Sequence, residues 1–408
     1  MPQSQYLSPG VYVEEEASAA RPIAGVGTST AGFIGVVDDK PEMPPQPGKF
    51  DDKKAGVPYT IADAGVPQLI TSWEEFKNSF GDIQAKNSPL SQAVYGFFNN
   101  GGTRCWVIRV ATAEAPKADS KQAGAGGWTN LAPLLDKFAG IDEIAIVAAP
   151  GATTKAQQDT LLSHCEIAKD RVAILDSAQT PANNDPGAIK SSGTGAAKDS
   201  TYGALYYPWI KVLDPSSGNN ISQPPSGHIA GIYARVDATR GVHKAPANEV
   251  IRGALDLEKR LSRADQDGLN PSGINAIRAF DGTIKVFGAR TLGGDNNQDF
   301  KYISTRRFFN FMRESIDHGT QWVVFEPNTP ALWQSITRNV TAFLTGVWRS
   351  GALFGVTAQE AFYVKCDADT NPPDQRELGM VVTEIGVSIV RPAEFVIFRV
   401  SQWAGPGK

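Results

Sequence analysis

The last stretch of the chain, residues 380–403, places the tightest limit on how the protein can fold. It contains two β-prone runs separated by Arg391-Pro392. In the first run every second residue falls on one face of an extended chain, which is the pattern of a half-buried strand. These residues are Val381, Thr383, Ile385, Val387 and Ile389. In the second run apolar side chains fall on both faces, so a strand here needs cover on both sides. Pro392 cannot continue a ladder from the first run into the second.

Two structures satisfy the second run. It can be the terminal strand of its own domain, or it can be a strand donated to a neighbouring subunit. A chain end is ordered only when something ties it down, so both structures require a partner surface. We predict that 380–390 is a strand of the subunit itself, and we leave the choice for 395–403 to the rest of the chain.

Composition limits the class of protein. A chain of 408 residues is long for one core, so two or more domains are expected. The hydrophobic content of 41% and the charged content of 20% are typical of a soluble globular protein. The net charge of −4 gives no reason to expect a nucleic acid or an anionic membrane as partner. The longest apolar run, Ile144 to Ala149, is far too short to span a membrane.

The N-terminus and the cysteines predict a protein that is made in a cytoplasm and either stays there or leaves by a route that the sequence does not encode. The N-terminus MPQSQYLSPG has neither the basic start nor the apolar segment of a secretory signal. Cys105, Cys165 and Cys366 are odd in number and far apart, which favours small buried side chains in a reducing compartment over a disulfide framework.

Residues 72–212 alternate between helical and strand patterns. Ser72 with Glu75 forms a capping box, Gly81 is placed to end that helix, and Pro89 begins the next. Further helices are predicted over 129–138 and 155–169, and strands over 105–110, 143–149, 171–176 and 205–212. Alternation at this spacing indicates a mainly parallel α/β sheet. A β-like run up to Val37 precedes this section, followed by a charged loop over 38–56.

The second half adds further helices and strands. Apolar residues at helical spacing over 229–236 stop at Gly241, and Ser262 with Asp265 caps a short helix that ends near Leu269. Helices are then predicted over 304–318 and 330–349, and strands over 274–278, 284–289, 322–325 and 361–366.

The sequence contains no recognisable catalytic, cofactor or metal site. It lacks a phosphate-binding G-x-x-x-x-G-K-[ST] and a dinucleotide G-x-G-x-x-G. The four histidines are not paired at metal-ligand spacing. Asp367-Ala368-Asp369-Thr370 follows a predicted strand as in haloacid-dehalogenase-type phosphatases, but no lysine follows it except Lys408. We interpret it as an acidic surface turn.

Six stretches together resemble contractile tail sheath proteins, which occur in phages and in phage-derived bacterial injection systems. They are YLSPGVYVEE (6–15), NGGTRCWVIRV (100–110), PPSGHIAGIYARVDATRGVHKAPAN (224–248), LNPSGINAIR (269–278), VFGARTL (286–292) and TRRFFNFMRESIDHGTQWVVFEPN (305–328). The resemblance follows the family's order over nearly the whole chain. It is greatest to compact sheaths without extra outer domains.

The resemblance implies an α/β fold with an α+β inner domain. Its domains would be an N-terminal arm (1–20), an α/β outer domain with a mainly parallel sheet (21–280), a tube-facing inner domain (281–391) and a C-terminal arm (392–408). The small sheet of the inner domain would be completed by arm strands from neighbouring subunits. The residues that would form these arm strands are Val11, Tyr12, Val13, Phe395, Val396, Ile397, Phe398 and Val400, and those that would form the hinges are Pro9, Gly10 and Pro392.

The function implied is a helical tube of stacked six-subunit rings around an inner tube, whose contraction ejects that tube through a target membrane. Expected partners are the inner tube, baseplate and tail-terminator or cap proteins, without nucleic acid or membrane insertion. Assembly would take place in the bacterial cytoplasm. From helix position, the residues expected to meet the tube are Lys301, Arg306, Arg307 and Arg313. The alternative function is an α/β hydrolase or phosphatase with Asp367 and Asp369 as its acids.

Overall fold

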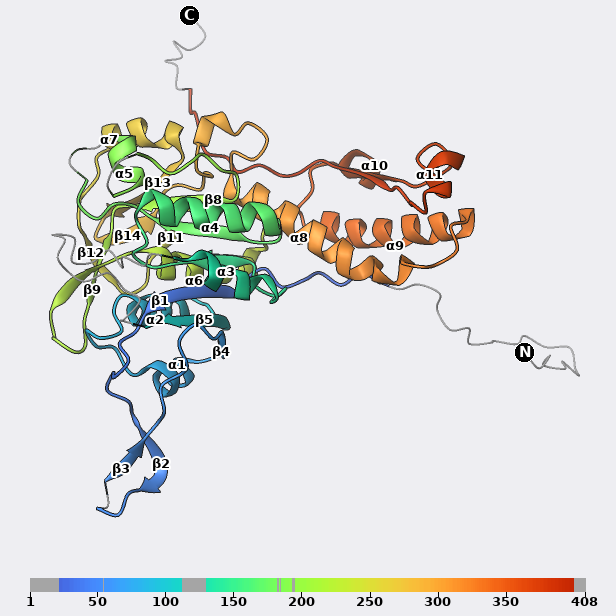
Figure 1. Ribbon diagram of the computed structural model, residues 1–408. Coiled ribbons are helices and arrows are strands. Elements are labelled where there is room, and N and C mark those ends of the chain that lie inside the picture. Colours follow the sequence, from blue (N-terminus) through green and yellow to red (C-terminus); the bar gives the residue numbers. More distant parts are fainter. Residues whose placement is uncertain are drawn as a thin grey trace, which may run out of the picture. The chain divides into compact units, whose positions relative to one another are not determined.

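The computed structural model describes residues 22–53, 55–111, 130–181, 183, 185–192 and 195–399 (Figure 1). The chain divides into two compact units. Among the described residues, the larger unit comprises 25–314 with 389–399, and the smaller unit comprises 22–24 with 315–388. One helix, α8 (Ile303–Thr320), contributes residues to both units.

The larger unit is built on one mixed sheet. Its nine described strands run in the order β11 (Glu249–Val250), β14 (Thr283–Val286), β13 (Ile274–Phe280), β8 (Gly203–Tyr207), β7 (Val172–Asp176), β6 (Ile146–Ala148), β1 (Ala31–Val36), β5 (Cys105–Val110) and β4 (Gln68–Ile70). From β13 to β5 all neighbouring strands are parallel, whereas β4, β14 and β11 pair antiparallel at the edges. The predicted mainly parallel α/β sheet is confirmed.

Helices cover both faces of this sheet, which is why its central strands are apolar on both sides. Phe33 of β1 points into one core and its neighbour Ile34 into the other. The Phe33 side is covered by α1 (Trp73–Phe80), α2 (Leu90–Asn99) and α6 (Ser226–Arg240). The Ile34 side is covered by α3 (Ala132–Ala139), α4 (Lys155–Ala168), α5 (Pro186–Lys190) and α7 (Arg263–Leu269).

Local capping chemistry sets several helix boundaries. The Ser72 hydroxyl accepts a hydrogen bond from the backbone N–H of Glu75 at the start of α1, and Gly81 ends that helix. Ser262 and Asp265 form a complete capping box on α7, and Gly241 follows α6 with a φ of 90°. These boundaries agree with those predicted from the sequence.

Helices α2 and α6 pack closely because glycines lie where they meet. A Cβ atom on Gly231 would lie 2.4 Å from the Phe97 carbonyl oxygen, and one on Gly227 would lie 2.3 Å from the Ala93 carbonyl oxygen. On α2, a Cβ on Gly96 would lie 2.3 Å from the imidazole of His228. Substituting any of these glycines would force the helices apart.

The strand predicted over 205–212 is wrong, because the chain forms two strands there. Strand β8 ends at Tyr207, and β9 (Ile210–Leu213) leaves the main sheet after Pro208. Proline has no N–H to donate to a ladder, so it interrupts the run. β9 pairs instead with β10 (Asn220–Gln223) and β12 (Ala254–Leu257) in a separate sheet.

The strand predicted over 322–325 is also wrong. The chain forms a 3-10 turn, η4 (Gln321–Val323), and Phe325 adopts a φ of 68°. A four-residue apolar run does not distinguish a strand from a turn by its pattern. Here the run lies in the short connection to α9 (Pro330–Arg349), which leaves the Phe325 side chain fully exposed.

The region predicted as a loop over 38–56 contains a hairpin. Strands β2 (Pro45–Phe50) and β3 (Gly56–Pro58) pair antiparallel and are mostly exposed. Figure 1 shows this hairpin projecting away from the main sheet of its unit.

The smaller unit places a helix beside a two-stranded sheet. Helix α9 confirms the helix predicted over 330–349, and it buries an apolar stripe with members Leu332, Ile336, Val340, Leu344 and Val347. Strand β15 (Phe362–Lys365) pairs antiparallel with β16 (Glu384–Val387), and the short helices α10 (Ala358–Ala361) and α11 (Pro373–Glu377) complete the unit. The strand predicted over 380–390 is therefore present in a shorter form.

The predicted boundary between residues 280 and 281 falls inside the larger unit. Residue Phe280 ends β13, and the chain returns at once as β14, which pairs with β13 from Phe280↔Thr283 to Ile277↔Val286. An antiparallel hairpin of this kind cannot be divided between two cores. The compact units instead separate within α8, between Glu314 and Ser315.

The close packing of α2 and α6 at Gly231 predicts that Gly→Ala substitutions in α6 and in α9 change the free energy of unfolding in opposite directions. Gly231→Ala should lower the free energy of unfolding by about 1–3 kcal/mol, because the added methyl meets the α2 backbone. Gly346→Ala in α9 is the matched control, because a Cβ there meets nothing within 4 Å. It should stabilise the protein by about 0.4–1 kcal/mol. Thermal unfolding of the purified subunits checks both values, and equal melting temperatures would contradict the packing described.

Candidate assembly surfaces

The C-terminal segment is attached to the larger unit through Glu394. Its Oε1 accepts hydrogen bonds from Arg290 Nε and Asn270 Nδ2, both at 2.8 Å. Its Oε2 accepts from Arg290 Nη2 at 2.9 Å and from Tyr302 Oη at 2.8 Å. The Arg290 side chain is 3% exposed and that of Glu394 is 19% exposed. A two-pronged, charge-assisted contact of this kind is strong and directional.

The surroundings of Glu394 favour its ionised form. Burial alone would raise the pKa of its carboxyl group, but hydrogen bonds from Arg290, Asn270 and Tyr302 outweigh burial and hold the pKa below its usual value. Burial, together with the bond to this carboxylate, raises the pKa of Tyr302 to about 12. The Tyr302 hydroxyl therefore remains a donor at neutral pH.

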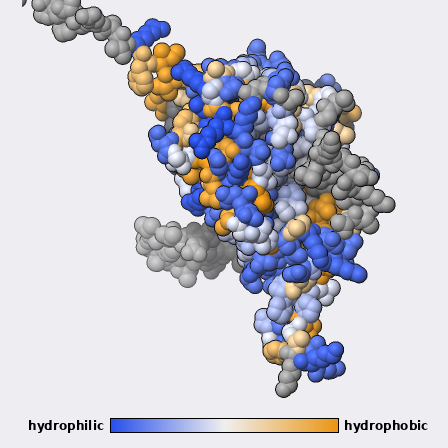
Figure 2. All heavy atoms as spheres, turned by 90° about the vertical axis from the view of Figure 1, so that its left-hand side faces the viewer, coloured by the Kyte–Doolittle hydropathy of each residue, from blue (hydrophilic) through white to orange (hydrophobic). Residues whose placement is uncertain are grey.

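Directly after this anchor the chain exposes four consecutive apolar residues. The exposed fractions are 70% for Phe395, 68% for Val396, 78% for Ile397 and 86% for Phe398. Residues 391–399 form no helix or strand within the described chain. Figure 2 shows hydrophobic side chains standing out at the upper edge of the view, where the described chain ends. A contiguous exposed apolar run marks an interaction surface.

The two-stranded sheet of the smaller unit offers a second such surface. In the described part of the chain β15 pairs only with β16, so each strand keeps one edge that no other strand covers. A groove of about 600 Å³ lies between α9 and β15 and includes Arg338, Thr341, Val364 and Lys365 in its wall. Tyr363 on β15 is 58% exposed. An open edge of this kind is a template for pairing with another strand.

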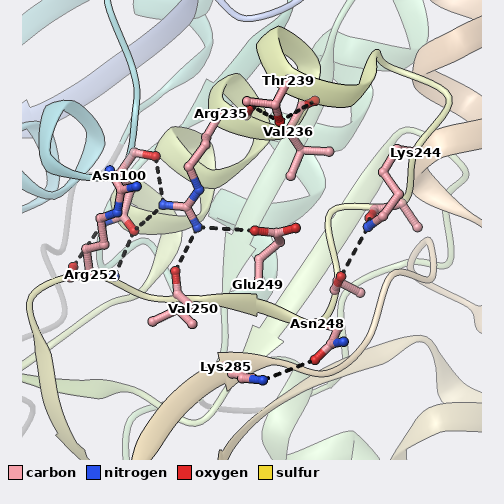
Figure 3. A network of polar contacts seen from close by, with 12 residues as sticks. Asn100, Arg235, Val236, Thr239, Lys244, Asn248, Glu249, Val250, Arg252 and Lys285 are labelled. Atoms are coloured by element: carbon pink, nitrogen blue, oxygen red, sulfur yellow. Dashed lines mark hydrogen bonds and ion pairs between the residues drawn. The ribbon is translucent and has the colours of Figure 1, made fainter.

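The stretch 224–248 is mainly a structural network (Figure 3). Arg235 on α6 donates to the Asn100 carbonyl oxygen at 3.1 Å and to the Val250 carbonyl oxygen at 2.8 Å. The Asn100 side-chain oxygen accepts from the backbone N–H of Arg252 at 2.9 Å, and Glu249 forms an ion pair with Arg235 at 3.5 Å. These bonds join the end of α2 to α6 and to the edge of the main sheet.

A buried ion pair connects the same stretch to α8. Arg307 Nη1 donates to Asp237 Oδ1 at 2.9 Å, and both side chains are almost fully buried. Asp237 Oδ2 also accepts from the Thr28 hydroxyl at 2.6 Å, and the Arg307 guanidinium lies 4.5 Å from the centre of the Tyr233 ring. With its hydrogen-bonding groups satisfied, the pair holds α6, α8 and the segment before β1 together.

The basic residues expected at the inner tube differ in exposure. Arg307 is buried against Asp237, and Arg306 is buried with its guanidinium over the Phe300 and Tyr202 rings. Because both guanidiniums are enclosed by their own subunit, the structure does not present them to a tube. Lys301 is partly exposed beside Asp295, and Arg313 is exposed. Tube contact remains a prediction for these two.

The structure describes only some of the other residues predicted to form the arm strands and hinges. Pro9, Gly10, Val11, Tyr12, Val13 and Val400 lie outside the described residues. Pro392 is half-buried and lies two residues before the Glu394 anchor. Glu394 was not predicted from the sequence, because its neighbours on the chain gave no sign of hydrogen-bond donors more than 90 residues away.

Asp367 and Asp369 form an exposed turn. Asp367 Oδ1 accepts from the backbone N–H groups of Asp369 at 3.0 Å and Thr370 at 3.2 Å, and Asp369 pairs with Lys365 at 2.9 Å. This agrees with an acidic surface turn.

Within the described ranges, no group of three or more His, Cys, Asp or Glu side chains is arranged to hold a metal ion. No helix in those ranges is long and apolar enough to cross a membrane.

The carboxyl edge of the main sheet, where α/β proteins usually bind ligands, holds the protein's own carboxylate. Asp176 at the end of β7 accepts from the Ser226 N–H at 2.9 Å, from the Ser226 hydroxyl at 2.7 Å and from the Gly151 N–H at 3.1 Å. Burial raises the pKa of Asp176 to about 6, although these bonds oppose the rise. The N-terminus of α6, which favours an anion, is thus satisfied internally.

Two family models match the chain in sequence. Residues 122–292 match the phage tail sheath protein central domain, and residues 295–402 match the phage tail sheath C-terminal domain. The chain belongs to the phage tail sheath family. As a member of it, the protein is the subunit of a contractile sheath, of a phage tail or of an injection system.

Individual relatives agree with this assignment. A prophage major tail sheath protein of Pseudomonas aeruginosa (strain UCBPP-PA14) is 26% identical over 357 residues, covering 84% of this sheath chain and 88% of the relative. The sheath of the anti-feeding prophage in its contracted state is 30% identical, with a TM-score of 0.71 and coverage of 97% and 99%. The contracted sheath of an extracellular contractile injection system, PVC, is 26% identical, with a TM-score of 0.73 and coverage of 98% and 99%.

The buried ion pair makes a prediction about the stability of the sheath subunit. Asp237→Asn should lower the free energy of unfolding by about 3–5 kcal/mol, because it leaves the buried Arg307 without a counter-charge. Asp256→Asn is the matched control, because its pair with Arg260 is exposed, and it should cost less than about 1 kcal/mol. Chemical denaturation measures both variants. Similar losses in the two would show that the pair does not connect these elements.

Proposed function

We propose that this sheath subunit assembles into a helical tube of stacked six-subunit rings around an inner tube, and that contraction of the sheath drives the tube through a target membrane. Family membership and the likeness to two contracted sheaths support the proposal. The observation that carries it is the run Phe395–Phe398, which follows a firmly anchored residue and yet is exposed on both of its faces.

The exposed run and the open sheet are complementary in chemistry. An extended segment that joins a sheet edge gains directional backbone hydrogen bonds, and its alternate side chains fill pockets on either face. The edges of β15 and β16 offer the backbone groups, and the groove beside α9 offers a place for side chains. We assign Phe395, Val396, Ile397, Phe398 and Val400 to a strand given to a second copy of the chain, with Val11, Tyr12 and Val13 as the corresponding N-terminal strand.

Strand donation from one copy to the next builds an open polymer. A head-to-tail contact that does not close on itself generates a helical assembly. With Pro9, Gly10 and Pro392 as hinges, the arms keep neighbouring subunits connected while their bodies slide into a shorter and wider lattice. The energy would be stored at assembly in a metastable packing and released through a bistable interface, without nucleotide hydrolysis.

The remaining assignments follow from this role. Residues 281–391 would face the inner tube, with Lys301 and Arg313 near that contact, and the α/β part formed by residues 21–280 would face outward. Baseplate and tail-terminator or cap proteins would bind the two ends of the sheath, which would be assembled in the bacterial cytoplasm. In this scheme the protein is structural and not an enzyme, uses no cofactor, and neither enters the membrane nor binds nucleic acid.

The arms can be tested by truncation. Deletion of residues 1–16 or of residues 392–408 should leave a folded, soluble monomer that forms no tubes, because each deletion removes a donated strand with its hinge and the second also removes the Glu394 anchor. Circular dichroism and size-exclusion chromatography measure folding, and electron microscopy measures assembly. Tubes built from either truncated chain would overturn strand donation.

A point variant controls for the size of the deletion. Ile397→Asp should block assembly, because a charged side chain cannot be buried at the recipient sheet. Ile167→Asp on α4 replaces an equally exposed isoleucine (82% against 78%) outside the arm and should still assemble.

A further inference from the structure

Arg290, Asn270 and Tyr302 together form the receptor for the Glu394 carboxylate. Contacts that do not involve Glu394 hold this receptor in place. The backbone N–H of Arg290 donates to Asn275 Oδ1 at 2.7 Å, and Asn275 Nδ2 donates back to the Arg290 carbonyl oxygen at 2.8 Å. Arg290 Nη1 donates to the Asn270 carbonyl oxygen at 2.9 Å and pairs with Asp295 at 3.1 Å. Because these bonds fix the guanidinium, it is pre-organised to receive a carboxylate.

The receptor also gathers donors from three separate places in the chain. Asn270 begins the 3-10 turn η2 (Asn270–Ser272), Arg290 follows β14, and Tyr302 immediately precedes α8. All three belong to the larger unit, whereas the strand that leads toward Glu394, β16, belongs to the smaller one. The chain after β16 is therefore tied to the larger unit just before its exposed apolar run begins.

We infer that the Arg290–Asn270–Tyr302 receptor fixes the point at which the C-terminal arm leaves the subunit, so that the arm pairs with another copy of the chain and not with its own sheet. This inference rests on the strand donation proposed above. Glu394 acts in it as a positioning residue, since its carboxylate is bound by donors of its own subunit.

The physical reason is competition between pairing within a chain and pairing between chains. Without the anchor, residues 388–394 form a linker from the end of β16 to the arm, and a loop of about seven residues closes at little entropic cost. The arm could then add to an open edge of its own small sheet. Its effective concentration there is of the order of millimolar. With Glu394 held by the larger unit, this linker is no longer free.

The test measures which chain the arm pairs with. Ile397→Cys places a thiol in the arm and Tyr363→Cys places one on β15, where both native side chains are more than half exposed. In a mixture of the two single variants, a bis-maleimide cross-linker reports pairing between chains as a dimer. In the double variant it reports pairing within a chain as an internally linked monomer. The parent chain, whose cysteines are all buried, measures background labelling.

Adding Glu394→Ala should move the cross-links from between chains to within chains. It should also raise the concentration at which tubes form by about tenfold, equivalent to about 1.4 kcal/mol. Tyr302→Phe removes a single donor to Glu394 and should shift both readouts in the same direction by a smaller factor. If Glu394→Ala fails to fold, the Tyr302→Phe variant tests the inference in its place. Glu377→Ala, at an exposed position on α11, is the control and should change neither readout.

The inference is overturned if both anchor variants, folded by circular dichroism, form tubes at the parent concentration with the parent ratio of cross-links. It is also overturned if the variants lose assembly while the within-chain cross-link stays absent. The arm deletion separates this result from the proposed function. If the chain lacking 392–408 still assembles, strand donation itself fails. If that chain does not assemble and the anchor variants do, only the positioning role fails.

Discussion

A sheet of two strands leaves an uncovered row of backbone N–H and C=O groups along the outer side of each strand, and the assembly proposed for this protein depends on that constraint. An isolated pair of strands is marginally stable in water and gains from further strands. In the smaller unit, β15 and β16 are such a pair, with α9 packed beside them. The chain also exposes an apolar segment with strand-like composition at Phe395–Phe398. Each feature is unfavourable by itself, and pairing between copies of the chain would satisfy both.

The larger unit, by contrast, is stabilised by its own contacts. Its sheet is buried on both faces, its helices α2 and α6 pack through glycines, and the Asp237–Arg307 pair joins distant segments. Four of the six stretches through which the sequence resembles sheath proteins lie wholly in this unit. A unit held together by such contacts can move as a whole when a lattice rearranges. The receptor for Glu394 is part of this unit, which is why it can define where the C-terminal arm begins.

Sequence reasoning succeeded where the signal is local. Caps such as Ser72 and Ser262 satisfy the first N–H groups of a helix within a few residues, and the two-residue and 3.6-residue periods report directly on burial. It failed where partners distant in sequence decide the structure. Pro208 directs the chain into a second sheet, and Phe325 lies in a tight connection and not in a strand. The domain boundary was misplaced because a hairpin and the long helix α8 carry the larger core to Glu314.

The candidate surfaces show the same division. The apolar character of Phe395–Phe398 is visible in the sequence, because it needs no partner to be recognised. The burial of Arg306 and Arg307 is not visible, because Asp237, Tyr202 and Phe300 are brought to them only by the fold. Glu394 is the clearest example, since its three donors lie 92 to 124 residues earlier in the chain.

The most direct test of strand donation is a cryo-EM reconstruction of the assembled sheath at a resolution that traces the backbone. Strand donation predicts continuous density from Glu394 of one subunit into residues 395–400, hydrogen-bonded along the free edge of β15 or β16 in a different subunit. Density that places these residues against the small sheet of their own subunit, or leaves that sheet two-stranded in the polymer, would contradict it.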